Sequence, residues 1–133
     1  MSGELLFVGR LLFGGVLAFT GVNHFLDLDD MTGYAAAKGL PAPRFAVIAS
    51  GVMLVLGGIG IVLGAYPTLA AGAIAVFLVV ATPKMHDFWN APDDQQQTEM
   101  TQFLKNAALL GAALAFLVLG GETWNYAVNV GLF

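Results

Sequence analysis

The chain has 133 residues, of which 58% are hydrophobic and 11% are charged, and its formal net charge is −4. Its mean hydropathy of +0.79 and two long uncharged stretches, 45–83 and 106–121, exclude a water-soluble globular domain. The absence of cysteine excludes a disulfide, a thiol nucleophile and a Cys-ligated metal centre, and the scarcity of Lys and Arg argues against a nucleic-acid partner.

Four segments are long and apolar enough to cross a bilayer, whose core of about 30 Å needs roughly 20 helical residues. In chain order they are 5–26, 45–64, 68–86 and 103–121. The sequence therefore predicts an all-α fold, a four-transmembrane-helix bundle that forms one integral membrane domain over residues 1–133. The lipid bilayer is its expected surroundings, and we expect a multi-pass protein of the cell membrane.

The connections between these segments differ in length. Residues 31–38 are predicted to form a short interfacial helix between the first and second spans, capped by Asp30 and ended by Gly39. Pro67 suits the first turn of the third span, so a tight hairpin is expected before it. Residues 91–100 are rich in Asp and Gln and predict a solvated connector, with Thr98 as a cap for the fourth span.

Small residues recur at the spacing that lets transmembrane helices approach closely. They are Gly60 and Gly64 in the second span, Ala71 and Ala75 in the third, and Ala107, Gly111 and Ala115 in the fourth. Packing within the bundle is the simpler interpretation, and a homo-oligomer formed through one such face is the alternative.

The charged residues are distributed unequally between the two membrane faces that four crossings define. Eleven of the fourteen, including four of the five Lys and Arg, lie on the face of the two long connections. The positive-inside rule places those loops in the cytoplasm and both termini outside.

Arg10 and His24 are the ionisable residues inside the first span. They are 14 positions apart, which is close to four helical turns, so they share one face that should point into the bundle. An ionisable group within a span is a functional candidate by default. For Arg10 the structural alternative is a side chain that extends to the interface and pairs with Glu4 or Glu122.

His24 and His86 end the first and third spans, so both fall on one membrane face at similar depth. With Asn23 and Asn106 they define a candidate polar pocket for a ligand. Three interpretations of this pocket stay open: histidines that only hydrogen-bond at helix ends, a site for a quinone or similar lipid-soluble molecule, and axial ligation of a haem by the two histidines. Transport is a fourth, but the apolar middles of the other spans do not support it. No other metal site is expected.

Several short motifs follow one another in the order and spacing of a known family. They are Gly9-Arg10, Thr20-Gly21-Val22-Asn23-His24-Phe25, Lys38-Gly39-Leu40-Pro41-Ala42-Pro43, Leu56-Gly57-Gly58-Ile59-Gly60-Ile61-Val62-Leu63-Gly64, His86-Asp87-Phe88-Trp89 and Phe103-Leu104-Lys105-Asn106. Together they resemble the DoxX family of small four-helix membrane proteins.

The resemblance implies an integral membrane protein associated with redox systems, because relatives are linked to thiosulfate oxidation with quinone as acceptor and to membrane assemblies that deal with oxidative stress. Arg10, His24 and His86 would occupy the family's polar positions. Many relatives carry an acidic residue in the second helix, whereas 52–56 is wholly apolar here. We therefore expect a redox-associated accessory subunit or a binder of a lipid-soluble ligand such as a quinone, with an oxidoreductase as its partner. A non-catalytic scaffold is the alternative, and whether the protein is an enzyme stays open.

Overall fold

The computed structural model describes residues 1–132 and consists of helices joined by short connections. In chain order they are α1 (Ser2–Leu26), α2 (Leu28–Ala37), α3 (Pro43–Leu63), α4 (Pro67–Met85), the 3-10 helix η1 (Phe88–Asn90) and α5 (Asp93–Leu119). Four of them, α1, α3, α4 and α5, are long and apolar enough to cross a membrane. This confirms the predicted all-α bundle of four transmembrane helices, with α2 as the short helix between the first two.

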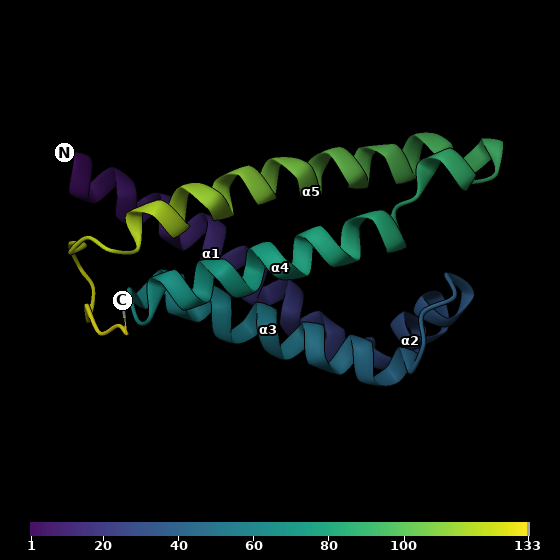
Figure 1. Cartoon of the computed structure of the whole chain (residues 1–133), viewed down its shortest axis with the longest axis horizontal. Helices are drawn as coiled ribbons and strands as arrows, with labels where there is room; N and C mark the ends of the chain where they lie inside the picture. The colour runs from purple at the N-terminus through teal and green to yellow at the C-terminus, as the bar shows by residue number, and fades with distance from the viewer. Residues whose placement is uncertain (133) are drawn as a thin grey trace.

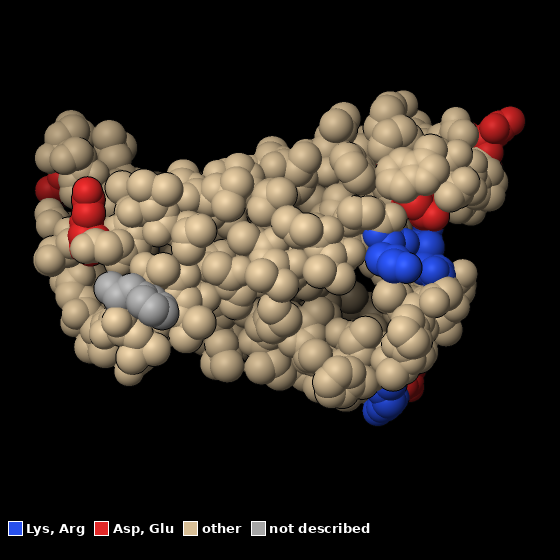
Figure 2. Space-filling model, in the orientation of Figure 1, with Lys and Arg blue, Asp and Glu red and all other residues tan. Residues whose placement is uncertain are grey.

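The long helices pack in chain order, α1 on α3, α3 on α4 and α4 on α5, while α2 packs on α3 (Figure 1). Both ends of the chain and the α3–α4 turn lie at one end of the bundle, which we call the terminal end (Figure 1). The loop end, opposite to it, holds α2 and the connection between α4 and α5. An uncharged belt separates the charged side chains of the two ends (Figure 2), as expected for a bundle surrounded by lipid.

Glycines bring α1 and α3 into backbone contact. A Cβ on Gly14 would lie 2.5 Å from the carbonyl oxygen of Gly58, and one on Gly21 would lie 2.7 Å from that of Gly51. Gly14 and Gly21 are seven residues apart on α1, and Gly51 and Gly58 are seven residues apart on α3, so on each helix the same face recurs after two turns. Because no larger residue fits at these crossings, the glycines fix how closely α1 and α3 lie.

The apolar core lies between α3, α4 and α5 toward the terminal end. Its most buried members are Leu54, Ile61, Ala71, Ile74, Leu78 and Ala113. Phe116 of α5 contacts Phe13 of α1, with ring centres 5.1 Å apart. In contrast, Ala107, Gly111 and Ala115 are exposed on the outer face of α5, and nothing packs against Gly111. These three small residues therefore do not hold this bundle together.

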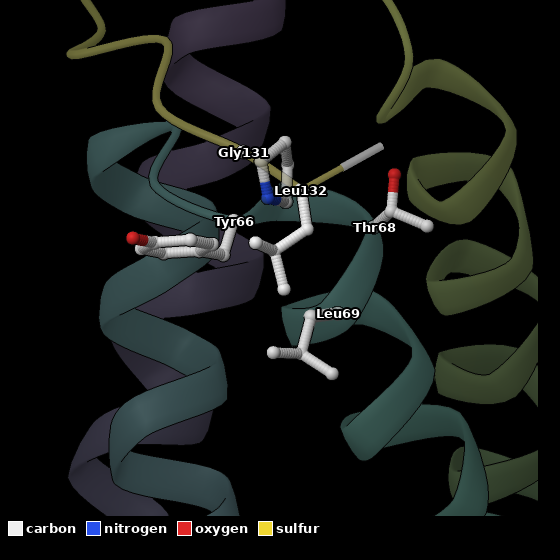
Figure 3. Close-up of a pocket in the computed structure, with 6 residues that line it drawn as sticks. Tyr66, Thr68, Leu69, Gly131 and Leu132 are labelled. Atoms are coloured by element: carbon white, nitrogen blue, oxygen red, sulfur yellow. The ribbon is translucent and has the colours of Figure 1, made fainter.

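The C-terminal segment folds back over the α3–α4 turn. The Val128 amide donates to the Leu63 carbonyl at 2.8 Å, and the Tyr66 amide donates to the Val130 carbonyl. Figure 3 shows Gly131 and Leu132 crossing the start of α4 next to Tyr66 and Leu69. The shallow pocket between them has no space for even a water molecule, so it offers no ligand site.

Two predicted boundaries are wrong. α2 begins at Leu28 rather than at 31, so Asp27 and not Asp30 precedes it. Its last residue is Ala37, and Gly39 terminates it as predicted, because the φ of 80° at Gly39 and the hydrogen bond from its amide to the Ala36 carbonyl form a left-handed helix cap.

The other boundary is the start of α5. This helix begins at Asp93, ten residues before the predicted span, and Thr98 lies inside it instead of capping it. The acidic first turn after Pro92 favours a helix start there because it complements the helix dipole. The expected solvated connector is therefore mostly helical.

Candidate functional site

A groove of about 770 Å³ opens in the loop-end half of the bundle. Its walls are mainly apolar side chains, and α2 and Leu40 cover its loop end. The apolar lining includes Leu12, Phe13 and Val16 of α1, Met53 and Leu54 of α3, Val76, Phe77 and Val80 of α4, and Leu109 of α5. In Figure 2 a hollow is visible beside a group of Lys and Arg side chains.

The groove is open on the side that faces lipid. Four of its lining residues, Leu12, Val16, Val76 and Val80, are more than half exposed. Figure 1 shows α1 passing behind α4 toward α2, whereas α5 stays on the opposite side of α4. The groove can therefore be reached from the apolar belt of the membrane without a passage through water.

His24 lies at the end of α1 and lines the groove, with only 6% of its surface exposed. Its Nδ1 atom is 3.1 Å from the Val47 carbonyl oxygen and 3.0 Å from Ser50 Oγ. A carbonyl oxygen can only accept, and the Ser50 hydroxyl itself donates to Val47 at 3.0 Å. Both contacts are satisfied when Nδ1 carries the proton, which makes Nε2 of the neutral ring an acceptor. No residue among 1–132 hydrogen-bonds to Nε2.

Asn106 of α5 is the second buried polar residue of the groove, with 9% of its surface exposed. Its side-chain amide makes no hydrogen bond within residues 1–132, although a primary amide offers two donors and one acceptor oxygen. Buried polar groups are normally hydrogen-bonded, because leaving one unpaired costs about 1–3 kcal/mol. His24 Nε2 and the Asn106 amide therefore mark one end of an apolar groove as the place for a polar group.

Two lysines complete the polar end of the groove. Lys84 and Lys105 both line it, and Lys105 Nζ donates to the side-chain oxygen of Gln102 at 2.6 Å. Within the described chain neither lysine is close enough to a carboxylate to form an ion pair. The groove therefore has a positively charged rim on the loop side.

A network centred on Lys38 joins α2, α4 and α5 above the groove. Lys38 Nζ lies 2.8 Å from Asp87 Oδ1 and 3.0 Å from Glu99 Oε2. The Tyr34 hydroxyl is within 3.1 Å of both Glu99 oxygens, and His86 Nδ1 is 3.6 Å from Glu99 Oε1 without a hydrogen bond. We call these five residues the Lys38 network.

The network shifts the titration of the two groups that α2 brings to it. Burial alone would lower the pKa of Lys38, but the hydrogen bonds that Lys38 donates to Asp87 and Glu99 raise that pKa above its ordinary value. Burial, and then the hydrogen bond to Glu99, raise the pKa of Tyr34. At neutral pH the lysine is therefore charged and the phenol neutral, which keeps α2 attached to α4 and α5.

Arg10 lies at the terminal end and does not line the groove. Its guanidinium donates to four backbone carbonyls, those of Ile61 at 3.1 Å, Val62 at 2.6 Å, Asn125 at 2.6 Å and Tyr126 at 3.0 Å. Its Cζ atom also lies 5.2 Å from the ring centre of Phe7 and 5.1 Å from that of Trp124.

The side chain of Arg10 is fully buried, and its hydrogen bonds replace the expected ion pair with Glu4 or Glu122. Glu4 instead pairs with the N-terminal amine at 2.7 Å. Arg10 thus holds the C-terminal segment against the end of α3.

The structure separates the predicted site residues into two groups. His24, His86 and Asn106 all line the groove, whereas Arg10 and Asn23 do not. Sequence reasoning missed Glu99, Lys38 and Tyr34 as residues around the groove. Glu99 had a usable signal, because Glu99, Phe103 and Asn106 recur at helical spacing and so share one face of α5.

The fold and the groove together describe a small four-helix membrane protein with a site that is accessible from lipid, and comparison with known proteins gives its family. The DoxX family model matches residues 5–87, so the chain belongs to the DoxX family. It is also 29% identical over 117 residues to inner membrane protein YphA of Escherichia coli (strain K12), a match that covers 87% of this chain and 83% of that protein. No solved structure matches the chain.

Proposed function

We propose that this DoxX protein binds one lipid-soluble ligand in the groove, with the ligand's polar head at His24 and Asn106. One observation carries the proposal: an apolar groove of about 770 Å³ that is open to lipid holds two side chains, each more than nine-tenths buried, that lack protein partners for polar atoms. This volume lies within the range of about 300–1,000 Å³ that is typical of small-molecule sites.

A quinone couple meets the requirements of this groove, because both of its forms combine an apolar body with oxygen atoms that can accept hydrogen bonds from Asn106 or Lys105, and the reduced form also has hydroxyl groups. A redox-associated role follows from that ligand class, since the bound quinone would exchange electrons with an oxidoreductase partner. Haem ligation is the competing interpretation, because His24 and His86 line the same groove. The same experiment distinguishes the two.

The test is to purify the protein in mild detergent, record its absorption spectrum and analyse its organic extract by mass spectrometry. We expect about one molecule of a lipid-soluble compound per chain, and saturable binding of added decylubiquinone or its reduced form, decylubiquinol, where the natural ligand has been lost. A Soret band would instead assign the groove to haem.

Two variants of α5 connect the ligand to the groove. Leu109→Trp fills the groove and should abolish ligand retention. Leu114→Trp lies on the same helix but outside the groove and should retain the ligand. Equal retention by both variants, or saturable binding by neither variant nor the wild type, would contradict the proposal.

We propose that the loop end faces the cytoplasm. Four of the five Lys and Arg residues lie there, which the positive-inside rule assigns to the cytoplasmic side. Because the chain has no cysteine, single substitutions Gln96→Cys and Thr123→Cys can be labelled in intact cells with a membrane-impermeant maleimide. We expect labelling at 123 only, and labelling at 96 only would reverse the orientation.

A second candidate function is assembly with another membrane protein or with a second copy of the chain. The exposed face of Ala107, Gly111 and Ala115 on α5 favours it, because such small residues allow close helix packing. Gly111→Leu should then remove the partner from crosslinked membranes without unfolding the monomer. Unchanged crosslinking would argue against this face as an interface.

A further inference from the structure

The hydrogen bonds of His24 decide which groups the groove can accept. Nδ1 is engaged with Val47 and Ser50 on α3, at 3.1 Å and 3.0 Å. The Val47 carbonyl has no hydrogen to give, so the proton belongs on Nδ1. The neutral ring therefore presents to the groove a nitrogen with a lone pair and no hydrogen.

We propose that the ligand head carries a hydroxyl group that donates its hydrogen to His24 Nε2. This inference rests on the proposed function and narrows its ligand class. A ketone, an ester or an ether has only acceptor oxygens, so its lone pairs would face the lone pair of Nε2. For a quinone couple, the groove selects the reduced form, which has hydroxyl groups, over the oxidised form.

Asn106 supplies the complementary contact. A hydroxyl group can donate its hydrogen to an acceptor such as His24 Nε2, and its oxygen can accept from a donor such as the Asn106 amide. Both residues line the groove, and neither atom has a partner within residues 1–132. A ligand with a hydroxyl group can therefore pair with either residue, whereas a ligand with only carbonyl oxygens can pair only with Asn106.

The test compares two probes, para-dodecylphenol and its methyl ether para-dodecylanisole, in which a methyl group replaces the hydroxyl hydrogen. The full chain is placed in phosphatidylcholine nanodiscs, and native mass spectrometry counts bound probe at matched mole fractions in the lipid. We expect the phenol to bind about tenfold more tightly than the ether, because the ether leaves Nε2 unpaired.

Two variants distinguish the effect of the hydrogen bond to His24 from the effect of the shape of the groove. His24→Asn keeps an N–H that can reach Val47, but its shorter side chain places no acceptor at the position of Nε2, so it should reduce phenol binding to the level of the ether. Thr20→Val changes another lining residue, whose hydroxyl already bonds to Val16, and should keep the tenfold preference.

The two proposals fail in different ways. If the phenol and the ether bind equally well to the wild type, or if His24→Asn keeps the preference, the hydroxyl inference is wrong and the groove remains a lipid-soluble ligand site. If neither probe saturates at one per chain, and neither decylubiquinone nor decylubiquinol does, the proposed function itself is overturned.

Discussion

Arg10 and His24 lie on one face of α1, yet their surroundings differ at the level of single hydrogen bonds. Arg10 donates to four carbonyls, and nothing of it is exposed. One ring nitrogen of His24 contacts Val47 and Ser50 on α3, and the other faces the groove. Burial of an ionisable group in a membrane helix therefore does not by itself indicate function. A hydrogen-bonding position without a protein partner is the more specific sign.

The strongest test of this comparison is Arg10→Met. It leaves four carbonyls without the donor that they share, and at about 1 kcal/mol for each lost hydrogen bond we expect a loss of up to about 4 kcal/mol in the free energy of unfolding. Unfolding in mixed micelles measures the loss. The exposed pair Arg44 and Asp29 is the control, because Arg44→Gln should change stability by no more than about 0.5 kcal/mol. Equal effects of the two variants would contradict the structural role of Arg10.

The next largest effect on stability is expected at the crossing of α1 and α3, which positions both Arg10 and His24. Gly58→Ala adds a methyl group against the backbone of Gly14 and should cost about 1–3 kcal/mol, because α1 and α3 must separate. Gly111→Ala is the matched control on α5, where the added atom meets open space. It should leave stability unchanged or increase it slightly. If Gly58→Ala unfolds at the wild-type midpoint, the close approach is not required.

A smaller effect is expected at the Lys38 network. Lys38→Met leaves the carboxylates of Asp87 and Glu99 without their cation, and we expect a loss of about 1–2 kcal/mol because the groups are partly exposed and solvent screens them. Hydrogen exchange should become faster in α2 while α3 keeps its protection. In a cycle with Glu99→Gln, additive effects would show that the two residues do not interact.

The smallest and most diagnostic effect is at Asn106. Asn106→Leu removes a buried amide that has no partner within residues 1–132, so the protein without ligand should be as stable as the wild type or up to about 1 kcal/mol more stable. Thermal unfolding after delipidation measures this. A loss above about 1 kcal/mol would show that the amide serves the fold and not a ligand.

The bundle was largely predictable, because uncharged stretches of about 20 residues have few alternatives to crossing a membrane. The start of α5 was not predicted correctly, since nine of its first ten residues are polar and the segment was assigned by composition. Pro92 followed by Asp93 and Asp94 is a helix-start pattern that could have corrected this. Once residues 93–102 are helical, Glu99 turns toward Lys38 and a supposed solvent loop becomes part of the Lys38 network.

Of the candidate site, the sequence predicted His24, His86 and Asn106 at one membrane face, and the groove brings these three together. The separate role of Arg10 could not be predicted. Its partners are carbonyls of residues up to 116 positions away, and a backbone carbonyl carries no sequence signal. The volume of the groove could not be predicted either, because it depends on where α1 and α5 are not in contact.

The contact between Arg10 and the C-terminal segment has a consequence for how the protein is made. Arg10 belongs to the first transmembrane helix, whereas Asn125 and Tyr126 are synthesised after all four helices. Until those residues leave the ribosome, a guanidinium inside the nascent bundle has only the two carbonyls of α3. The hydrogen bonds of Arg10 are therefore complete only after Asn125 and Tyr126 have been synthesised. A product truncated before Asn125 would leave a charge in the membrane without its full set of partners, which quality-control proteases could recognise.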